Sequence, residues 1–187
     1  DIKNTEQQRN ALQNLITTLG KVDIFIANAG VSCIQKPLQD NGVYIRKAID
    51  VNFTAAADGI EFVRTLMVKQ NFGSLVGITS IAQAKGMPLN GTYCATKAAL
   101  HVFLQGLRID LAKTPINVIE VAPGFIATDM TKKNKFFMPF LMKANVAAEA
   151  ICKGIIAQNK KIVVPTVFKF LFLLLKLMPN TIYEWVA

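Results

Sequence analysis

The sequence predicts an α/β domain in which a doubly wound parallel sheet carries helices on both faces. Short apolar runs alternate with longer helical stretches along the 187 residues, and this alternation is typical of parallel strands joined by helical crossovers. A hydrophobic content of 52% and a mean hydropathy of +0.35 exclude a disordered or fibrous chain. We therefore expect one domain over residues 1–187.

The first predicted elements are a helix and a strand. Thr5 with Gln8 three residues later forms a capping box. The helix then shows one apolar face, made of Leu12, Leu15, Ile16 and Leu19. Gly20 ends it. Residues 22–27 predict a buried strand that opens into a turn at Asn28, Ala29 and Gly30.

Two long helices flank the second strand. Residues 41–70 contain no Pro and predict one helix, whose stripe is Ile45, Ile49, Asn52 and Ala56. Residues 73–80 predict a buried strand. Residues 91–111 predict a helix that is apolar on nearly every side, so we expect the sheet and a further partner, such as another subunit, to cover it.

The remaining elements complete the alternation. Residues 116–122 predict a third strand that closes at Pro123 and Gly124, and residues 146–156 predict a helix. A short strand at 162–164 and an apolar helix at 167–178 follow. Parallel sheets bind ligands at the carboxyl ends of their strands, so the turns at 28–30, 80 and 123–124 should converge on one crevice.

Tyr93 and Lys97 are the sharpest chemical feature. A spacing of four residues stacks them on one face of a helix. A nearby ammonium favours phenolate, so we expect Lys97 to lower the pKa of Tyr93 and to make it a usable general acid or base. Taken alone, the pair is more often two residues that share a helix face by chance.

Ser80 and Asn52 give that pair a context. Ser80 ends a predicted strand, where its hydroxyl could hold a substrate carbonyl or simply serve a turn. Asn52 interrupts an apolar stripe, so its amide needs partners, either a backbone group of a kinked helix or an ordered water. A satisfied core asparagine is an equally good interpretation.

Together these residues resemble the short-chain dehydrogenase/reductase family of Rossmann-like enzymes. The resemblance rests on five motifs in order: Asn28-Ala29-Gly30, Asn52, Ser80, Tyr93 with Lys97, and Pro123-Gly124. It implies a catalytic tetrad of Asn52, Ser80, Tyr93 and Lys97. Tyr93 would exchange a proton with the substrate oxygen and Ser80 would orient that oxygen. Lys97 would lower the tyrosine pKa and hold the nicotinamide ribose, and Asn52 would anchor a relay water.

The resemblance also implies an NAD or NADP cofactor, with a slight preference for NADP. Asn28, Ala29 and Gly30 would lie along its adenosine side, and Asp1-Ile2 matches an acidic position that contacts adenine. The residues expected around the nicotinamide are Tyr93, Lys97, Pro123, Gly124, Ile126 and Thr128.

The sequence departs from the family at its start. It contains no Gly-rich phosphate-binding spacing, and the N-terminal βαβαβ portion that would carry it is absent from these residues. The chain begins at Asp1 without Met and resembles the interior of a longer chain. A sheet without its first strands exposes a pairing edge, so we expect an isolated fragment to be unstable.

Apolar residues mark the expected substrate pocket and tail. Met87 and Leu89 lie between Ser80 and Tyr93, and Phe136 and Met138 follow Thr128. Ordinary packing is an equally good interpretation of them. The helix at 167–178 is too short to span a bilayer. It either covers the substrate entrance, packs on a partner subunit, or lies on a membrane surface with help from Lys160 and Lys161.

Charge and cysteine content bound the remaining functions. The net charge is +9, of which residues 125–187 contribute +6 from 9 basic and 3 acidic residues. We expect no nucleic-acid partner, because the basic residues lack interleaved stacking aromatics. The three cysteines match no zinc spacing and His101 is the only histidine, so no metal site is expected. The absence of a pattern that would pair all three cysteines favours a reducing, cytoplasmic location.

These observations predict an NAD(P)-dependent oxidoreductase that interconverts a carbonyl and a secondary alcohol on an apolar small molecule. A homodimer or homotetramer is the expected assembly. Two alternatives remain: a non-catalytic module of the same fold that serves membrane-surface contact or oligomerisation, and an inactive truncated fragment.

Overall fold

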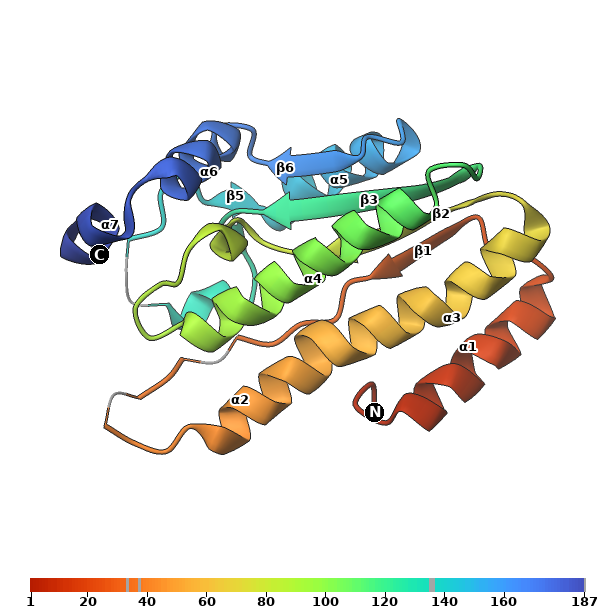
Figure 1. The fold of residues 1–187 in the computed structure, drawn as a ribbon, viewed down its shortest axis with the longest axis horizontal. Coiled ribbons are helices and arrows are strands. Elements are labelled where there is room, and N and C mark those ends of the chain that lie inside the picture. The colour runs from red at the N-terminus through yellow and green to blue at the C-terminus, as the bar shows by residue number, and fades with distance from the viewer. Residues whose placement is uncertain (33, 37, 135–136, 187) are drawn as a thin grey trace.

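A four-stranded parallel sheet forms the centre of the computed structural model, which describes residues 1–32, 34–36, 38–134 and 137–186 (Figure 1). The strand order is β1-β2-β3-β6, and every neighbouring pair is parallel. The strands are β1 (Ile24–Ala27), β2 (Gly73–Ile78), β3 (Ile116–Pro123) and β6 (Lys161–Val164).

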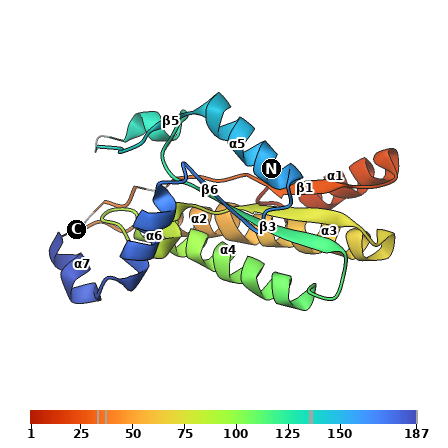
Figure 2. The same cartoon turned by 90° about the horizontal axis from the view of Figure 1, so that it is seen from above.

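Helices cover both faces of this sheet, which confirms the predicted doubly wound α/β class. Figure 2 shows α3 and α4 on one side of the strands and α5 on the other, while α1 lies beside α3. The helices are α1 (Thr5–Leu19), α2 (Gly42–Ile49), α3 (Ala55–Gln70), α4 (Gly91–Asp110), α5 (Ala144–Ile156), α6 (Phe168–Leu177) and α7 (Asn180–Val186).

Alternate residues of β3 supply the two cores. Val118 packs with Leu100 and Leu104 of α4 on one face of the sheet. Ile119 and Val121 face the other way and pack with residues of α5 and β6. This alternation follows from the two-residue period of a strand, and it fixes α4 against the middle of the sheet.

The start of α1 corrects one sequence prediction. The N-cap is Asn4, whose side chain accepts a hydrogen bond from the Gln7 backbone N–H at 2.9 Å, so the predicted capping box of Thr5 and Gln8 is wrong. The side chain of Gln8 instead donates to the Ala55 carbonyl of the neighbouring helix. Gly20 ends the helix as predicted, in the left-handed region at φ +73°.

The long helix predicted over residues 41–70 is continuous but not uniform. A π-helical segment, Asp50–Thr54, separates α2 from α3. Such segments insert a residue into the helical ladder and are frequent at functional sites. Asn52 lies in this segment.

The sequence did not predict several short elements. β1 begins at Ile24, two residues later than expected, and α7 was not expected. A 3-10 helix at Ile81–Ala84 follows β2, and another occupies Thr131–Lys133. A second, two-stranded parallel sheet pairs β4 (Ile126–Ala127) with β5 (Met142–Lys143). These elements are too short to show a periodic pattern.

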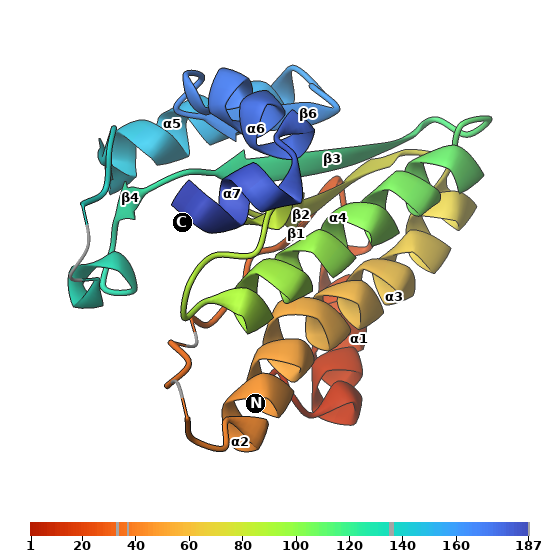
Figure 3. The ribbon, with the colours of Figure 1, turned by 60° about the vertical axis from the view of Figure 1, so that its left-hand side comes forward.

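Apolar side chains are exposed on β1 and on α6. β1 forms one edge of the sheet, and its side chains Ile24 and Ile26 are nearly half exposed. At the carboxyl ends of the strands, α6 and α7 lie together (Figure 3). Within the described part of the chain, none of the helices is both long enough and apolar enough to cross a membrane.

Candidate active site

A cavity of about 850 Å³ lies at the carboxyl ends of the strands, where the three predicted turns converge. Gly30 follows β1, Ser80 follows β2 and Gly124 follows β3, and all three line this cavity. Tyr93 and Lys97 of α4 line it as well. The fold therefore brings residues from four separate segments to one place, as the parallel topology predicts.

Ser80 is fixed at the end of β2. It is the N-cap of the 3-10 helix at Ile81–Ala84, and its Oγ accepts a hydrogen bond from the Ala82 backbone N–H at 3.2 Å. The hydroxyl also donates to the Pro123 carbonyl oxygen at 3.5 Å. These two contacts hold the hydroxyl at the cavity wall between β2 and β3.

Tyr93 and Lys97 lie on consecutive turns of α4, as their spacing predicts. The Lys97 Nζ lies 5.9 Å from the centre of the Tyr93 ring. It also donates a hydrogen bond of 2.8 Å to the carbonyl oxygen of Ile78, the last residue of β2. The ammonium is therefore held between the phenol ring and the sheet.

Burial dominates the pKa values of this pair. Desolvation raises the pKa of Tyr93 above its usual value of 10.0, and a hydrogen bond with Ser80 acts in the opposite direction. The expectation that Lys97 lowers the pKa of Tyr93 is therefore wrong, because burial raises this pKa. Lys97 is itself only 4% exposed, and desolvation lowers its pKa from 10.5 to about 8.

Asn52 lies behind the cavity wall and is fully buried. Its Oδ1 accepts from the Val31 backbone N–H at 2.7 Å, and its Nδ2 donates to the Val31 carbonyl at 3.0 Å. The same amide donates to the Thr96 hydroxyl of α4 at 3.2 Å. The partners that the structure shows are thus the backbone after β1 and a hydroxyl of α4, and the backbone of the kinked helix is not among them. The side chain ties the segment after β1 to the helix that carries Tyr93.

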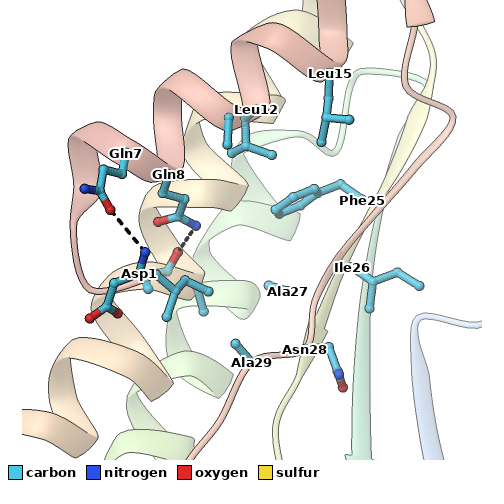
Figure 4. Close-up of a pocket in the computed structure, with 14 residues that line it drawn as sticks. Asp1, Gln7, Gln8, Leu12, Leu15, Phe25, Ile26, Ala27, Asn28 and Ala29 are labelled. Carbon is cyan, nitrogen blue, oxygen red and sulfur yellow. Dashed lines mark hydrogen bonds between the residues drawn. The ribbon is translucent and has the colours of Figure 1, made fainter.

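The residues expected around a cofactor divide between two neighbouring cavities. The larger one is lined by Asn28, Ala29, Gly30, Tyr93, Lys97, Pro123, Gly124, Ile126 and Thr128. A second cavity of about 400 Å³ lies between α1 and β1 and contains Asp1 and Ile2 (Figure 4). Asn28 and Ala29 line both cavities, so the two adjoin.

This arrangement fits an elongated dinucleotide. A Cβ built at Gly30 would lie 3.6 Å from Lys97 Nζ and 3.5 Å from Asn52 Oδ1. Any larger side chain there would fill the space beside the lysine, so glycine leaves room for a ligand to approach the ammonium. The adjoining cavity offers an apolar wall from Ala11, Leu12 and Ala55, which suits a flat aromatic base.

Only part of the expected substrate pocket is found in this cavity. Met87 lines it. Leu89 is not among the lining residues, because it occupies a left-handed turn at φ 58° and is about half exposed. Met138 does not line it either; its sulfur accepts from Asn134, which does. Phe136 lies outside the described residues.

The C-terminal helices supply lining residues that were not individually predicted. Leu171 and Leu175 of α6 and Tyr183 of α7 face the cavity. Tyr183 donates a hydrogen bond of 2.6 Å to the Gly86 carbonyl oxygen and so fastens α7 to the loop before α4. The spacing of Leu171 and Leu175 on an apolar helix was visible in the sequence. Its inward face could not be chosen, because apolar residues cover the whole helix surface except the face of Lys169 and Lys176.

Comparisons with known proteins found a family model and curated relatives that match this chain. A family model described as short chain dehydrogenase matches residues 1–137. An uncharacterized oxidoreductase of Myxococcus xanthus (strain DK1622) is 32% identical over 187 residues, which are 100% of this chain and 74% of that protein. The 11-beta-hydroxysteroid dehydrogenase-like 3 protein of Arabidopsis thaliana is 32% identical over 190 residues, covering 97% of this chain and 60% of that protein.

Solved structures share the fold. A short chain dehydrogenase from Burkholderia cenocepacia J2315 in complex with NADP has a TM-score of 0.82 at 23% identity, over 98% of this chain and 77% of that one. A 4-hydroxyisoleucine dehydrogenase complexed with NADH has a TM-score of 0.75 at 24% identity, over 88% and 76%. This chain spans 74% of the length of the Myxococcus xanthus relative and 60% of the Arabidopsis thaliana one, and about half the length of some other curated relatives.

Proposed function

This chain belongs to the short-chain dehydrogenase family. We propose that it acts as an NAD(P)-dependent oxidoreductase that interconverts a ketone and a secondary alcohol on an apolar small molecule. The observation that carries this proposal is that Ser80, Tyr93 and Lys97 line one cavity. A hydroxyl, a phenol and an ammonium at one wall can hold a carbonyl oxygen and exchange a proton with it.

Each side chain has a separate role in the proposed reaction. The Ser80 hydroxyl donates to the substrate oxygen and orients it. In reduction the Tyr93 phenol gives its proton to that oxygen as the alcohol forms, and the Lys97 ammonium stabilises the phenolate that is left. A bound nicotinamide would supply the hydride to the carbonyl carbon, or accept it in the reverse direction.

Because burial raises the pKa of Tyr93, its partners must favour the phenolate if this side chain is to lose its proton. Desolvation alone favours the neutral phenol, which is the form needed to donate a proton in reduction. Ser80 favours the phenolate that follows, and we assign the same effect to the Lys97 ammonium, which lies 5.9 Å from the ring centre. The pair therefore offsets the cost of burying a negative charge at the moment when it forms.

We assign the cofactor to the two adjoining cavities. Asn28, Ala29 and Gly30 would lie along its adenosine side, with Asp1 and Ile2 at the adenine. The residues assigned to the nicotinamide side are Lys97, Pro123, Gly124, Ile126 and Thr128. The substrate would then contact the apolar wall of Met87, Leu171 and Leu175, which favours an apolar carbonyl or alcohol.

The test is turnover by the full native chain. We expect the protein to oxidise NADPH or NADH in the presence of apolar ketones from a test panel. The reaction is monitored by the fall in absorbance of the reduced nicotinamide. Replacing Tyr93 with Phe removes the proton donor and keeps the ring, so turnover should fall by about three orders of magnitude while cofactor binding persists. Tyr44→Phe on α2, away from the cavity, is the matched control. Full activity of the Tyr93 variant would overturn the proposal.

One observation favours a second role, contact with a membrane surface. The outward side of α6 carries Phe170, Leu173, Leu174 and Leu177 at the spacing of a single helical stripe, and each is more than half exposed. Trp185 of α7 is 88% exposed. Residues 125–187 carry a net charge of +6, so an anionic phospholipid surface is the occupant we propose for this stripe.

A further inference from the structure

A buried carboxylate lies beneath the segment that carries Ser80. Glu120 is on β3, in the middle of the sheet, and is only 1% exposed. Burying an ionised carboxylate is costly unless hydrogen bonds and opposite charges surround it. The partners of Glu120 therefore show what this side chain holds in place.

One carboxylate oxygen of Glu120 contacts both ends of the Ser80 segment. Its Oε1 accepts from the Gln83 side-chain amide at 2.6 Å. The Thr79 hydroxyl lies 3.2 Å from the same oxygen and shares its proton with the Val121 carbonyl oxygen at 3.0 Å. Thr79 precedes Ser80 directly, and Gln83 follows it by three residues. The carboxylate thus holds the segment 79–83 on both sides of Ser80.

The other oxygen contacts the helix that carries Tyr93. Glu120 Oε2 lies 2.9 Å from His101 Nδ1. His101 is four residues after Lys97 and eight after Tyr93 on α4, so the three side chains follow the same helical face. One side chain therefore joins the Ser80 segment to the Tyr93 helix.

A lysine completes the surroundings of this carboxylate. Lys161 Nζ of β6 lies 3.6 Å from Glu120 Oε1. The same ammonium lies 4.3 Å from the centre of the Phe172 ring of α6. It supplies a positive charge from the opposite side and contacts neither the Ser80 segment nor α4 in the described interactions. Its role at Glu120 is charge compensation.

We propose that Glu120 is a positioning residue that sets the location of the Ser80 hydroxyl relative to the Tyr93 phenol. This inference rests on the proposed function, because it concerns the same two side chains. Positioning has large effects on rate: a displacement of about 1 Å at reacting groups can cost about 100-fold. Loss of the carboxylate removes the acceptor of the Gln83 amide, one of the two acceptors of the Thr79 hydroxyl and the neighbour of His101 Nδ1. The Ser80 segment and α4 can then shift against each other.

The first experiment compares two replacements of Glu120 in the full native chain. Glu120→Val removes the carboxylate and keeps a good strand former; we expect kcat to fall about 10- to 100-fold while KM for the nicotinamide cofactor changes less than about twofold. Glu120→Gln keeps an oxygen that accepts from Gln83 and Thr79, and its amide can donate to His101 Nδ1 when the neutral imidazole carries its proton on Nε2. It should therefore recover most of the lost kcat.

Val118→Ala is the matched control for lost stability. Val118 lies two residues before Glu120 on the same face of β3 and packs against the same helix, without contact to the segment 79–83 in the described interactions. It should lower the urea midpoint and leave kcat within about twofold of wild type. A folded Glu120→Val protein with wild-type kcat, or an equal loss of kcat in Val118→Ala, would overturn the proposal.

A second measurement tests the same inference without turnover. In protein labelled with ¹³C at the tyrosine ζ carbon, the Tyr93 resonance is assigned from its loss in Tyr93→Phe. Ser80 lowers the pKa of Tyr93, so this resonance senses the position of Ser80. It should move in Ser80→Ala and in Glu120→Val alike, and stay in place in Val118→Ala. A Tyr93 signal that Glu120→Val leaves unmoved contradicts the positioning role. If wild-type protein oxidises no reduced nicotinamide, the proposed function fails, while the NMR result still decides this one.

Discussion

Lys97 places its ammonium 5.9 Å from the centre of the Tyr93 ring and fastens it to the Ile78 carbonyl oxygen at 2.8 Å. The hydrogen bond fixes the charge at the end of β2, where the phenol meets the cavity. Lys97 has no carboxylate among its described partners, so burial lowers its pKa to about 8. Burial of the Lys97 ammonium beside the cavity therefore lowers the free energy of unfolding.

The first prediction follows from the sign of this pKa shift. The folded-state pKa of about 8 lies below the usual 10.5, so between these pH values the unfolded chain binds more protons than the folded one. The unfolding free energy therefore rises with pH across this window through Lys97. Below pH 8 the full penalty applies, so Lys97→Met should stabilise the apoprotein at pH 7 by about 2 kcal/mol, after allowance for the lost hydrogen bond.

Urea unfolding of wild type and Lys97→Met at pH 7 and at pH 10 measures this effect. The stability advantage of the variant over wild type should shrink at the higher pH. Lys153→Met, at an exposed position on α5, is the control and should change little. A Lys97 variant that is less stable than wild type at pH 7 would contradict the prediction.

The second prediction concerns Asn52 as a structural tie. Asn52→Ala removes all three of its side-chain hydrogen bonds and leaves the Val31 N–H and carbonyl without these partners. We expect a loss of about 3 kcal/mol in unfolding free energy, measured by urea denaturation. Asn14→Ala, at an exposed position on α1, should be neutral or slightly stabilising. Equal stability of the two variants would show that the amide holds nothing.

The parts of this fold that the sequence predicted are those with a repeating pattern. The alternation of β2, α4, β3 and α5 is visible in residues 73–156 as apolar runs and helical stripes. In each element the apolar residues recur with a period of two or 3.6 over enough residues to be recognised. The order of the parallel strands then places Ser80, Tyr93 and Gly124 together. Topology thus accounts for most of the predicted site.

The parts that were missed depend on contacts between distant residues. Asn4 caps α1 in place of Thr5, although both are good capping residues, because the chain enters the helix one residue earlier. The pKa of Tyr93 was expected to fall, since the sequence shows the neighbouring Lys97 but not the depth of burial. Glu120 looked like an ordinary strand residue, and only tertiary structure reveals its four partners.

The third prediction tests how closely α4 lies on the sheet. A Cβ at Gly77 of β2 would lie 2.6 Å from Leu104 Cδ1, and Leu104 is fully buried. Gly77→Ala should therefore destabilise the protein by about 1 to 3 kcal/mol. Gly106→Ala, within α4, meets no heavy atom within 4 Å and should stabilise by about 0.5 to 1 kcal/mol. Thermal unfolding of the pair gives opposite shifts if the packing is as described, and shifts of one sign if it is not.

The fourth prediction tests the membrane role of α6. In Leu173→Glu/Leu174→Glu, two carboxylates replace the centre of the exposed stripe. Burying each leucine side chain in lipid is worth about 1.5 to 3 kcal/mol, so affinity for vesicles containing phosphatidylserine should fall more than tenfold in a co-sedimentation assay. Ile109→Glu, on the outward side of α4 and 76% exposed in the wild type, changes the charge by the same kind of substitution and should bind as wild type does.

Two further conditions separate lipid from a second copy of the chain as the occupant of this stripe. A lipid surface predicts weaker binding to pure phosphatidylcholine and at high salt, because anionic headgroups attract the basic C-terminal third. If the double variant instead turns a dimer into a monomer and vesicle binding does not change, the stripe is a subunit interface and the membrane proposal is wrong.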